Sequence, residues 1–205
     1  YILSPNTILI DAAHLDFVAF DMIVNFERIL GRRVGPADLP QWLDCIALDG
    51  GIRPGDNEVQ AVFIHDKEQP ALKHFAPAQF ADELHEKAFR DNLGEFQLTS
   101  FPIEPIVGRE DFLVQTFEAL MREPKVERIM LVADLDGHTP ESVELLNRIK
   151  QLCAQPPTTE SGEQLPPKDI TLFAMAPING RGFNSEILGY SLTAALGISG
   201  GELQG

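Results

Sequence analysis

The sequence contains few of the features that would favour disulfide-rich, zinc-binding or membrane proteins. Its two cysteines, Cys45 and Cys153, are far apart in the chain and lack the close spacing of metal ligands. We therefore expect reduced thiols and a cytoplasmic protein. No apolar run reaches the roughly 18 residues that a membrane span needs. Asp11 and Asp16 interrupt the apolar part of residues 1–20, so we predict neither a signal peptide nor a membrane-bound protein.

Positive charge is also scarce. The chain has 16 lysines and arginines against 31 aspartates and glutamates, which gives a net charge of −15 at pH 7. Such a surface repels phosphate backbones and gains little from counterion release. The charge therefore disfavours RNA and other nucleic acids as general partners. It leaves open an enzyme whose acidic cleft is neutralised by a divalent metal ion.

One stretch of the chain combines a buried strand with acidic residues. The apolar run 129–133 is typical of a strand that is buried on both faces. Asp134 and Asp136 follow it, Gly137 permits a sharp turn, and Thr139 and Pro140 are expected to start a helix. Because ligands of open α/β sheets bind at the carboxyl ends of such strands, a site is expected here.

The rest of the chain alternates between strands and helices. Short apolar runs predict strands over 7–10, 59–64, 94–101, 129–133 and 170–176. Helical patterns cover 12–30, 35–51, 78–91, 109–122, 140–153 and 183–196. This order is typical of a three-layer α/β/α fold with a mainly parallel, five-stranded sheet. We expect a single domain over residues 1–205, with a mobile, proline-rich loop at about 155–168.

Some details of the helices can also be predicted. In the helix over 12–30, an apolar stripe is expected to face the core; it comprises Phe17, Phe20, Ile23 and Val24, extended by Phe26, Ile29 and Leu30. Gly31 is expected to end the helix. The next helix is expected to be capped by Pro36 or Asp38. A tail without regular structure is expected from residue 199 onward.

Acidic residues stand at three strand ends or helix starts: Asp11, the pair Glu110 and Asp111, and Asp134 with Asp136. If the first and fourth strands are neighbours, their ends lie about 5 Å apart and the carboxylates converge. Clustered carboxylates attract Mg²⁺ or Mn²⁺, which can activate water and polarise a phosphate. We therefore predict a metal site formed by Asp11, Asp111, Asp134 and Asp136.

Simpler roles remain open for the same residues. Asp134 and Asp136 can cap the turn into the following helix, and Glu110 with Asp111 suits the first turn of a helix. Three histidines also lie just past strand ends, where they can serve in acid–base chemistry, bind metal or remain unliganded. These are His14, His65 and His138.

The placement of these acids resembles the PIN-like nuclease superfamily, and the NYN branch is the nearest. The resemblance rests on the strand 8–11 that ends in Asp11, on the helix start at Asp111, and on the segment 131–136. It implies a PIN-like fold and a divalent-metal phosphodiesterase or ribonuclease, with Asp11, Asp134 and Asp136 as catalytic residues. The whole chain also resembles an uncharacterised bacterial family of PIN-like domains.

The chain departs from the nuclease pattern at several positions. His14 replaces a frequent asparagine, Gln115 replaces a helical carboxylate, and Gly137 replaces an aromatic residue after the second aspartate. An inactive PIN-like module that assembles with itself or with another protein is therefore the alternative. The segment 132–139 also resembles the first motif of haloacid-dehalogenase-type phosphatases, but that motif normally opens the chain. A phosphatase is thus less favoured.

Overall fold

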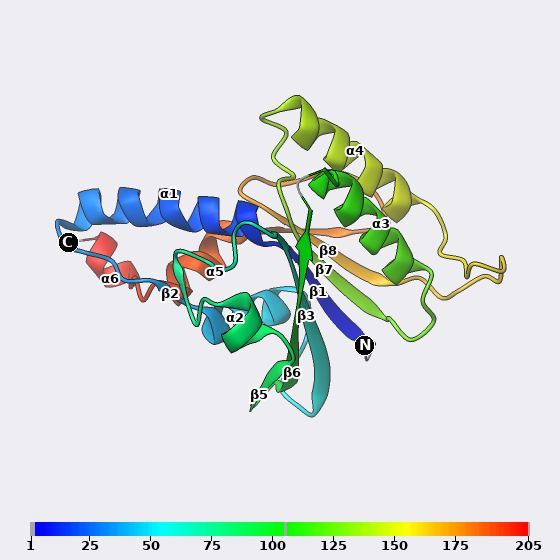
Figure 1. Cartoon of the computed structure of the whole chain (residues 1–205), viewed down its shortest axis with the longest axis horizontal. Helices are drawn as coiled ribbons and strands as arrows, with labels where there is room; N and C mark the ends of the chain where they lie inside the picture. Colours follow the sequence, from blue (N-terminus) through cyan, green and yellow to red (C-terminus); the bar gives the residue numbers. More distant parts are fainter. Residues whose placement is uncertain (1–2, 105, 205) are drawn as a thin grey trace.

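The computed structural model describes residues 3–104 and 106–204, which form an α/β fold around one large sheet (Figure 1). The sheet has seven strands in the order β5-β6-β3-β1-β7-β8-β9, and only β5 runs antiparallel to its neighbour. Its five central strands confirm the predicted ones. They are β1 (Asn6–Asp11), β3 (Asn57–Asp66), β6 (Gly94–Ile103), β7 (Arg128–Val132) and β8 (Asp169–Ala174).

The expected count of five strands is too low, because both edges of the sheet carry one more. β9 (Asn184–Ile187) pairs with β8 but is partly exposed and lacks an alternating apolar pattern. It occupies the start of the helix predicted over 183–196. β5 (Lys87–Asp91) pairs with the edge of β6 and replaces the second half of the helix predicted over 78–91, whose first half contains the π-helix η1 (Phe80–Leu84). Pairing with the exposed edge of β6 satisfies backbone groups that an isolated helical turn would leave to water.

Helices cover both faces of the sheet, as the three-layer prediction requires (Figure 1). One face carries α1 (Ala12–Leu30), α2 (Leu39–Asp49) and α5 (Leu188–Ala195). The other carries α3 (Arg109–Met121) and α4 (Pro140–Ala154). Shorter elements complete the fold: a two-stranded sheet of β2 (Ala37–Asp38) and β4 (Phe75–Ala76), the π-helix η1 (Phe80–Leu84), and α6 (Gly200–Leu203), which corrects the predicted tail.

The predicted helix ends are confirmed where the local chemistry is specific. Gly31 ends α1 in the left-handed conformation, with φ of 66°, which favours glycine. The side chains of Asp38 and Thr139 accept hydrogen bonds from the backbone amides of Gln41 and Ser142, and so cap α2 and α4.

The predicted apolar face of α1 is confirmed for Ile23, Phe26 and Leu30, which are buried or pack against the core, but is wrong for its other members. Phe17, Phe20 and Val24 are 67%, 49% and 42% exposed. The helix instead buries a face of mostly smaller residues, namely Ala12, Leu15, Val18, Ala19 and Ile23. Since both faces are apolar at helical spacing, the pattern alone could not decide between them.

The segment 155–168 contains no helix or strand, which agrees with the predicted loop. It closes on itself through a backbone hydrogen bond from Leu165 to Pro157. None of the helices in the described parts of the chain combines the length and apolar character needed to cross a bilayer.

The carboxyl groups of Asp44, on α2, and Asp91, at the end of β5, lead to a prediction about how stability depends on pH. Burial, a hydrogen bond to Asp91 and repulsion from Asp91 and Asp38 raise the pKa of Asp44 from 3.8 to about 7. The folded state therefore holds a proton that the unfolded chain releases, and this stabilisation disappears as pH rises from about 4 to about 7. We expect the free energy of unfolding of Asp44→Asn, relative to that of the wild type, to rise by about 1 kcal/mol between pH 5 and pH 8. This value is reduced because the carboxyl group is partly accessible to solvent.

Urea unfolding followed by circular dichroism at the two pH values measures this gain. Asp21→Asn, at an exposed position of α1, is the control and should show no change in the difference between the two pH values. A pH-independent effect of Asp44→Asn would contradict the shared-proton interpretation.

Candidate functional site

The order of the strands identifies the carboxyl ends of β1 and β7 as the place where a ligand site is expected. Along the chain, the sheet first grows from β1 through β3 to β6, and then resumes on the other side of β1 with β7 and β8. β1 and β7 are parallel neighbours, which meets the condition for convergence stated above, so their carboxyl ends lie side by side. The helices that follow them, α1 and α4, cover opposite faces of the sheet. Ligands of open α/β sheets bind in the crevice at such a switch point.

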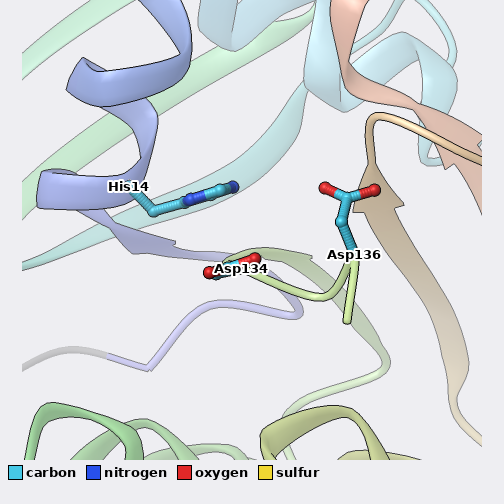
Figure 2. Close-up of side chains that lie close together, drawn as sticks. All are labelled: His14, Asp134 and Asp136. Atoms are coloured by element: carbon cyan, nitrogen blue, oxygen red, sulfur yellow. The ribbon is translucent and has the colours of Figure 1, made fainter. Parts of the chain in front are cut away.

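Three side chains converge at this switch point. His14, in the first turn of α1, faces Asp134 and Asp136, which stand in the loop after β7 (Figure 2). Each residue offers one ligand atom, and these atoms lie within 4.8 Å of one another. All three residues are partly buried. The structure thus brings together two of the four predicted ligands and adds a histidine.

Hydrogen bonds hold the two aspartates in place. The hydroxyl of Ser142, on α4, is 3.1 Å from Oδ1 of Asp134 and accepts a hydrogen bond from the amide of Gly137. The carboxylate of Asp136 accepts hydrogen bonds from the amides of Met175 and Ala176, which follow β8. These bonds fix the loop geometry. They also show that Asp136 ties the ends of two strands together whether or not it binds a ligand.

Asp11 lies at the end of β1 and is buried, with only 4% of its surface exposed. Its carboxylate caps α1 by accepting a hydrogen bond from the amide of His14, and Oδ2 lies 3.4 Å from Nε of Arg109. Burial raises the pKa of Asp11, while Arg109 and the His14 amide oppose that rise. Arg109 also pairs with Asp66 at 3.1 Å. Arg109 is therefore shared between the carboxylates of Asp11 and Asp66.

Asp111 is not brought to the other predicted ligands. Its carboxylate is 63% exposed and forms an ion pair with Arg148 of α4 at 2.5 Å. Its neighbour Glu110 lines the cavity beside Asp11 and Asp134 instead. The first turn of α3 thus turns the two acids in different directions, which the sequence could not specify.

An open cavity of about 280 Å³ lies at the switch point, and we call it the acidic cavity. Four of its lining residues are acids: Asp11, Glu110, Asp134 and Glu141. Arg109 and Ser142 also line it, and the sequence does not predict either of them as a site residue. The position of Arg109 could have indicated a special role. A cation in the first turn of a helix interacts unfavourably with the helix dipole, so its presence there points to another favourable interaction.

The chemistry of the donors fits a divalent cation. Nε2 of His14 is buried and has no hydrogen-bond partner among the residues that the structure describes. Buried ring nitrogens are normally paired, and a metal ion would satisfy this one. Two carboxylates with one imidazole suit Mn²⁺ better than Mg²⁺, which prefers oxygen ligands alone.

Comparisons with known proteins place the chain in a family without assigning an activity. Residues 1–203 match a family described as a family of unknown function (DUF6621), and the chain belongs to that family. No curated protein and no solved structure matches the chain.

Proposed function

We propose that this protein is a PIN-like, divalent-metal-dependent phosphodiesterase whose active site is the acidic cavity. The observation that carries the proposal is the convergence of His14, Asp134 and Asp136 at the switch point of the sheet. The arrangement of acids after β1 and β7, on neighbouring parallel strands, further supports the PIN-like interpretation. Cys45 and Cys153 are both free thiols, which supports our placement of the protein in the cytoplasm.

The residues of the site have separate roles in this proposal. His14 and Asp134 line the acidic cavity, and together with Asp136, which converges with them, they would hold Mn²⁺ or Mg²⁺. A cation there supplies Lewis acidity toward a phosphoryl oxygen and acidifies water. Glu110 and Glu141 line the same cavity and provide carboxylates that can accept a proton.

Asp11 acts as a positioning residue in this scheme. It caps α1 and thereby fixes the turn that carries His14, while Arg109 balances its charge. The resemblance implies RNA as a substrate class, but a net charge of −15 works against binding a polyanion.

The phosphatase alternative finds less support. A phosphatase of that type needs a lysine near the first aspartate of its motif. The amine of Lys168 instead donates hydrogen bonds to the carbonyls of Glu123 and Val126, at the amino ends of β7 and β8. That end of the sheet lies opposite Asp134.

Metal binding and turnover test the proposal together. We expect Asp134→Asn to weaken Mn²⁺ binding at least about 10-fold, because it removes a charged ligand. The matched control is Asp111→Asn, whose carboxylate pairs with Arg148 outside the cavity, and it should retain wild-type affinity. Titration calorimetry measures the affinity, and Mn²⁺-dependent hydrolysis of bis(p-nitrophenyl) phosphate measures turnover. Equal turnover by Asp134→Asn and the wild type would refute the assignment.

The second candidate is a non-catalytic module that assembles with itself or with another protein. A specific observation favours it: the outer face of α1 exposes Phe17, Phe20, Val24 and Ile29. The carboxylates of Asp11 and Asp136 are also engaged by protein groups already. Absence of both Mn²⁺ binding and turnover in the wild type would favour this candidate.

A further inference from the structure

A second hollow, rich in aromatic rings, adjoins the acidic cavity. It has a volume of about 280 Å³ and lies between α1 and the segment that follows β3. We call it the aromatic hollow, and its ring-bearing and cationic lining residues are Phe17, Phe20, His65, Lys73, His74 and Phe80. Ala13 and Phe17 line both hollows, so they form the shared wall.

The walls of the aromatic hollow are held in place. The carboxylate of Asp16, on α1, accepts hydrogen bonds from the amides of Lys73 and His74 at 2.8 and 3.0 Å. The ring of His74 packs against that of Phe20, with centroids 5.1 Å apart. These contacts fasten the segment after β3 to α1. The hollow is therefore a formed feature of the surface and does not depend on a ligand to order it.

His65 provides a polar group inside this aromatic wall. The residue is 6% exposed, and its ring stacks on Phe80 with centroids 3.9 Å apart. Nδ1 lies 3.0 and 3.1 Å from the carbonyl oxygens of Asp66 and Gln69, so it must carry the proton that both can accept. In the neutral ring, Nε2 is then an acceptor, and it has no partner within the described part of the chain.

We infer that the aromatic hollow binds the flat, nitrogen-containing ring of a small nucleotide whose phosphate lies in the acidic cavity. This inference rests on the proposed function, because the acidic cavity must receive the phosphate. Exposed phenylalanine rings stack on bases of any kind, and Nε2 of His65 can accept a hydrogen bond from an amino group of the base. Phe17, 67% exposed on the shared wall, separates the two binding regions.

Size and charge favour a small nucleotide over a polymer. A hollow of about 280 Å³ has room for about one nucleoside and is smaller than the usual site of a drug-sized ligand. Lys73, at this hollow, forms no ion pair within the described residues, so it can face an anionic ligand. A chain with net charge −15 repels a long polyanion far more than a single phosphate.

Ligand-observed NMR titrations with three probes test the inference: adenosine, ribose 5-phosphate and AMP, each with EDTA and with Mn²⁺. We expect adenosine to bind without metal, and Phe17→Ala to weaken it about 10-fold, since stacking on one ring is lost. The matched control, Ile29→Ala, removes an equally exposed apolar side chain from the same helix and should change nothing. Phe17→Tyr keeps the ring and should retain binding.

The outcomes separate this inference from the proposed function. Mn²⁺ should strengthen binding of AMP but not of adenosine. If Mn²⁺ binds to the protein while adenosine does not, the inference is overturned and the metal site stands. If adenosine binds through Phe17 but Mn²⁺ adds nothing for AMP, the ring site stands and the proposed phosphodiesterase fails. Tighter binding of a single-stranded hexa-adenylate than of AMP at physiological salt would overturn the preference for a small ligand.

Discussion

Replacing Trp42 with alanine is expected to lower the free energy of unfolding by about 4 kcal/mol. Trp42 is fully buried on α2, its ring lies edge-on to Phe75, and its Nε1 donates a hydrogen bond to Ser191 of α5 at 3.1 Å. The substitution removes the apolar volume that joins α2 to α5 and the small sheet. Urea unfolding should be followed by far-ultraviolet circular dichroism, because Trp42 is the single tryptophan and its loss removes the fluorescence signal.

Two further variants separate volume from hydrogen bonding. Trp42→Phe keeps most of the apolar volume and loses the indole N–H together with part of the ring, so a loss of about 1–2 kcal/mol is expected. Leu48→Ala, at a 40% exposed position of the same helix, should cost less than about 1 kcal/mol. If Trp42→Ala cost no more than Leu48→Ala, the packing of α2 against α5 would not be as described.

The central strands could be predicted because their own residues form apolar runs, and these runs indicate a buried strand without knowledge of the neighbouring elements. A run such as 129–133 is apolar at every position, which suits a strand covered on both faces. The edge strands gave no such signal. β5 and β9 are short and partly exposed, and they exist because each completes the hydrogen bonds of a longer neighbour. Residue patterns within 87–91 and 184–187 do not contain that information.

The candidate site was predictable to the level of the sheet edge but not of the individual ligand. The order of strand, aspartate and helix located Asp134 and Asp136 correctly at the end of β7, beside β1. The position of the Asp111 side chain depends on the rotation of α3 about its axis, and this rotation directs the carboxylate of Asp111 to Arg148. The sequence indicates only that His14 lies just past a strand end. Its convergence with the two aspartates depends on the direction of α1 relative to β1, which the sequence does not specify.

The ion pair of Asp11 and Arg109 leads to the second large prediction. Asp11 is buried beneath the site, and removal of its counter-charge would leave a carboxylate in a poorly solvated position. We expect Arg109→Met to lower the free energy of unfolding by about 3 kcal/mol at pH 7, somewhat less than for a fully buried pair because the arginine side chain is 31% exposed. Urea unfolding in EDTA measures this loss without interference from metal ions.

A double-mutant cycle identifies the cause of that loss. Asp11→Asn removes the buried charge but keeps an acceptor that can cap α1 at the amide of His14, so adding it to Arg109→Met should restore about 2 kcal/mol. Arg90→Met is the control, because Arg90 pairs with Asp56 where both side chains are largely exposed, and it should cost less than about 1 kcal/mol. A double variant no more stable than Arg109→Met would show that packing, and not the charge of Asp11, gives Arg109 its importance. Recovery would instead establish that the protein supplies its own cation at the base of the acidic cavity, which leaves Asp134, Asp136 and His14 to bind an external one.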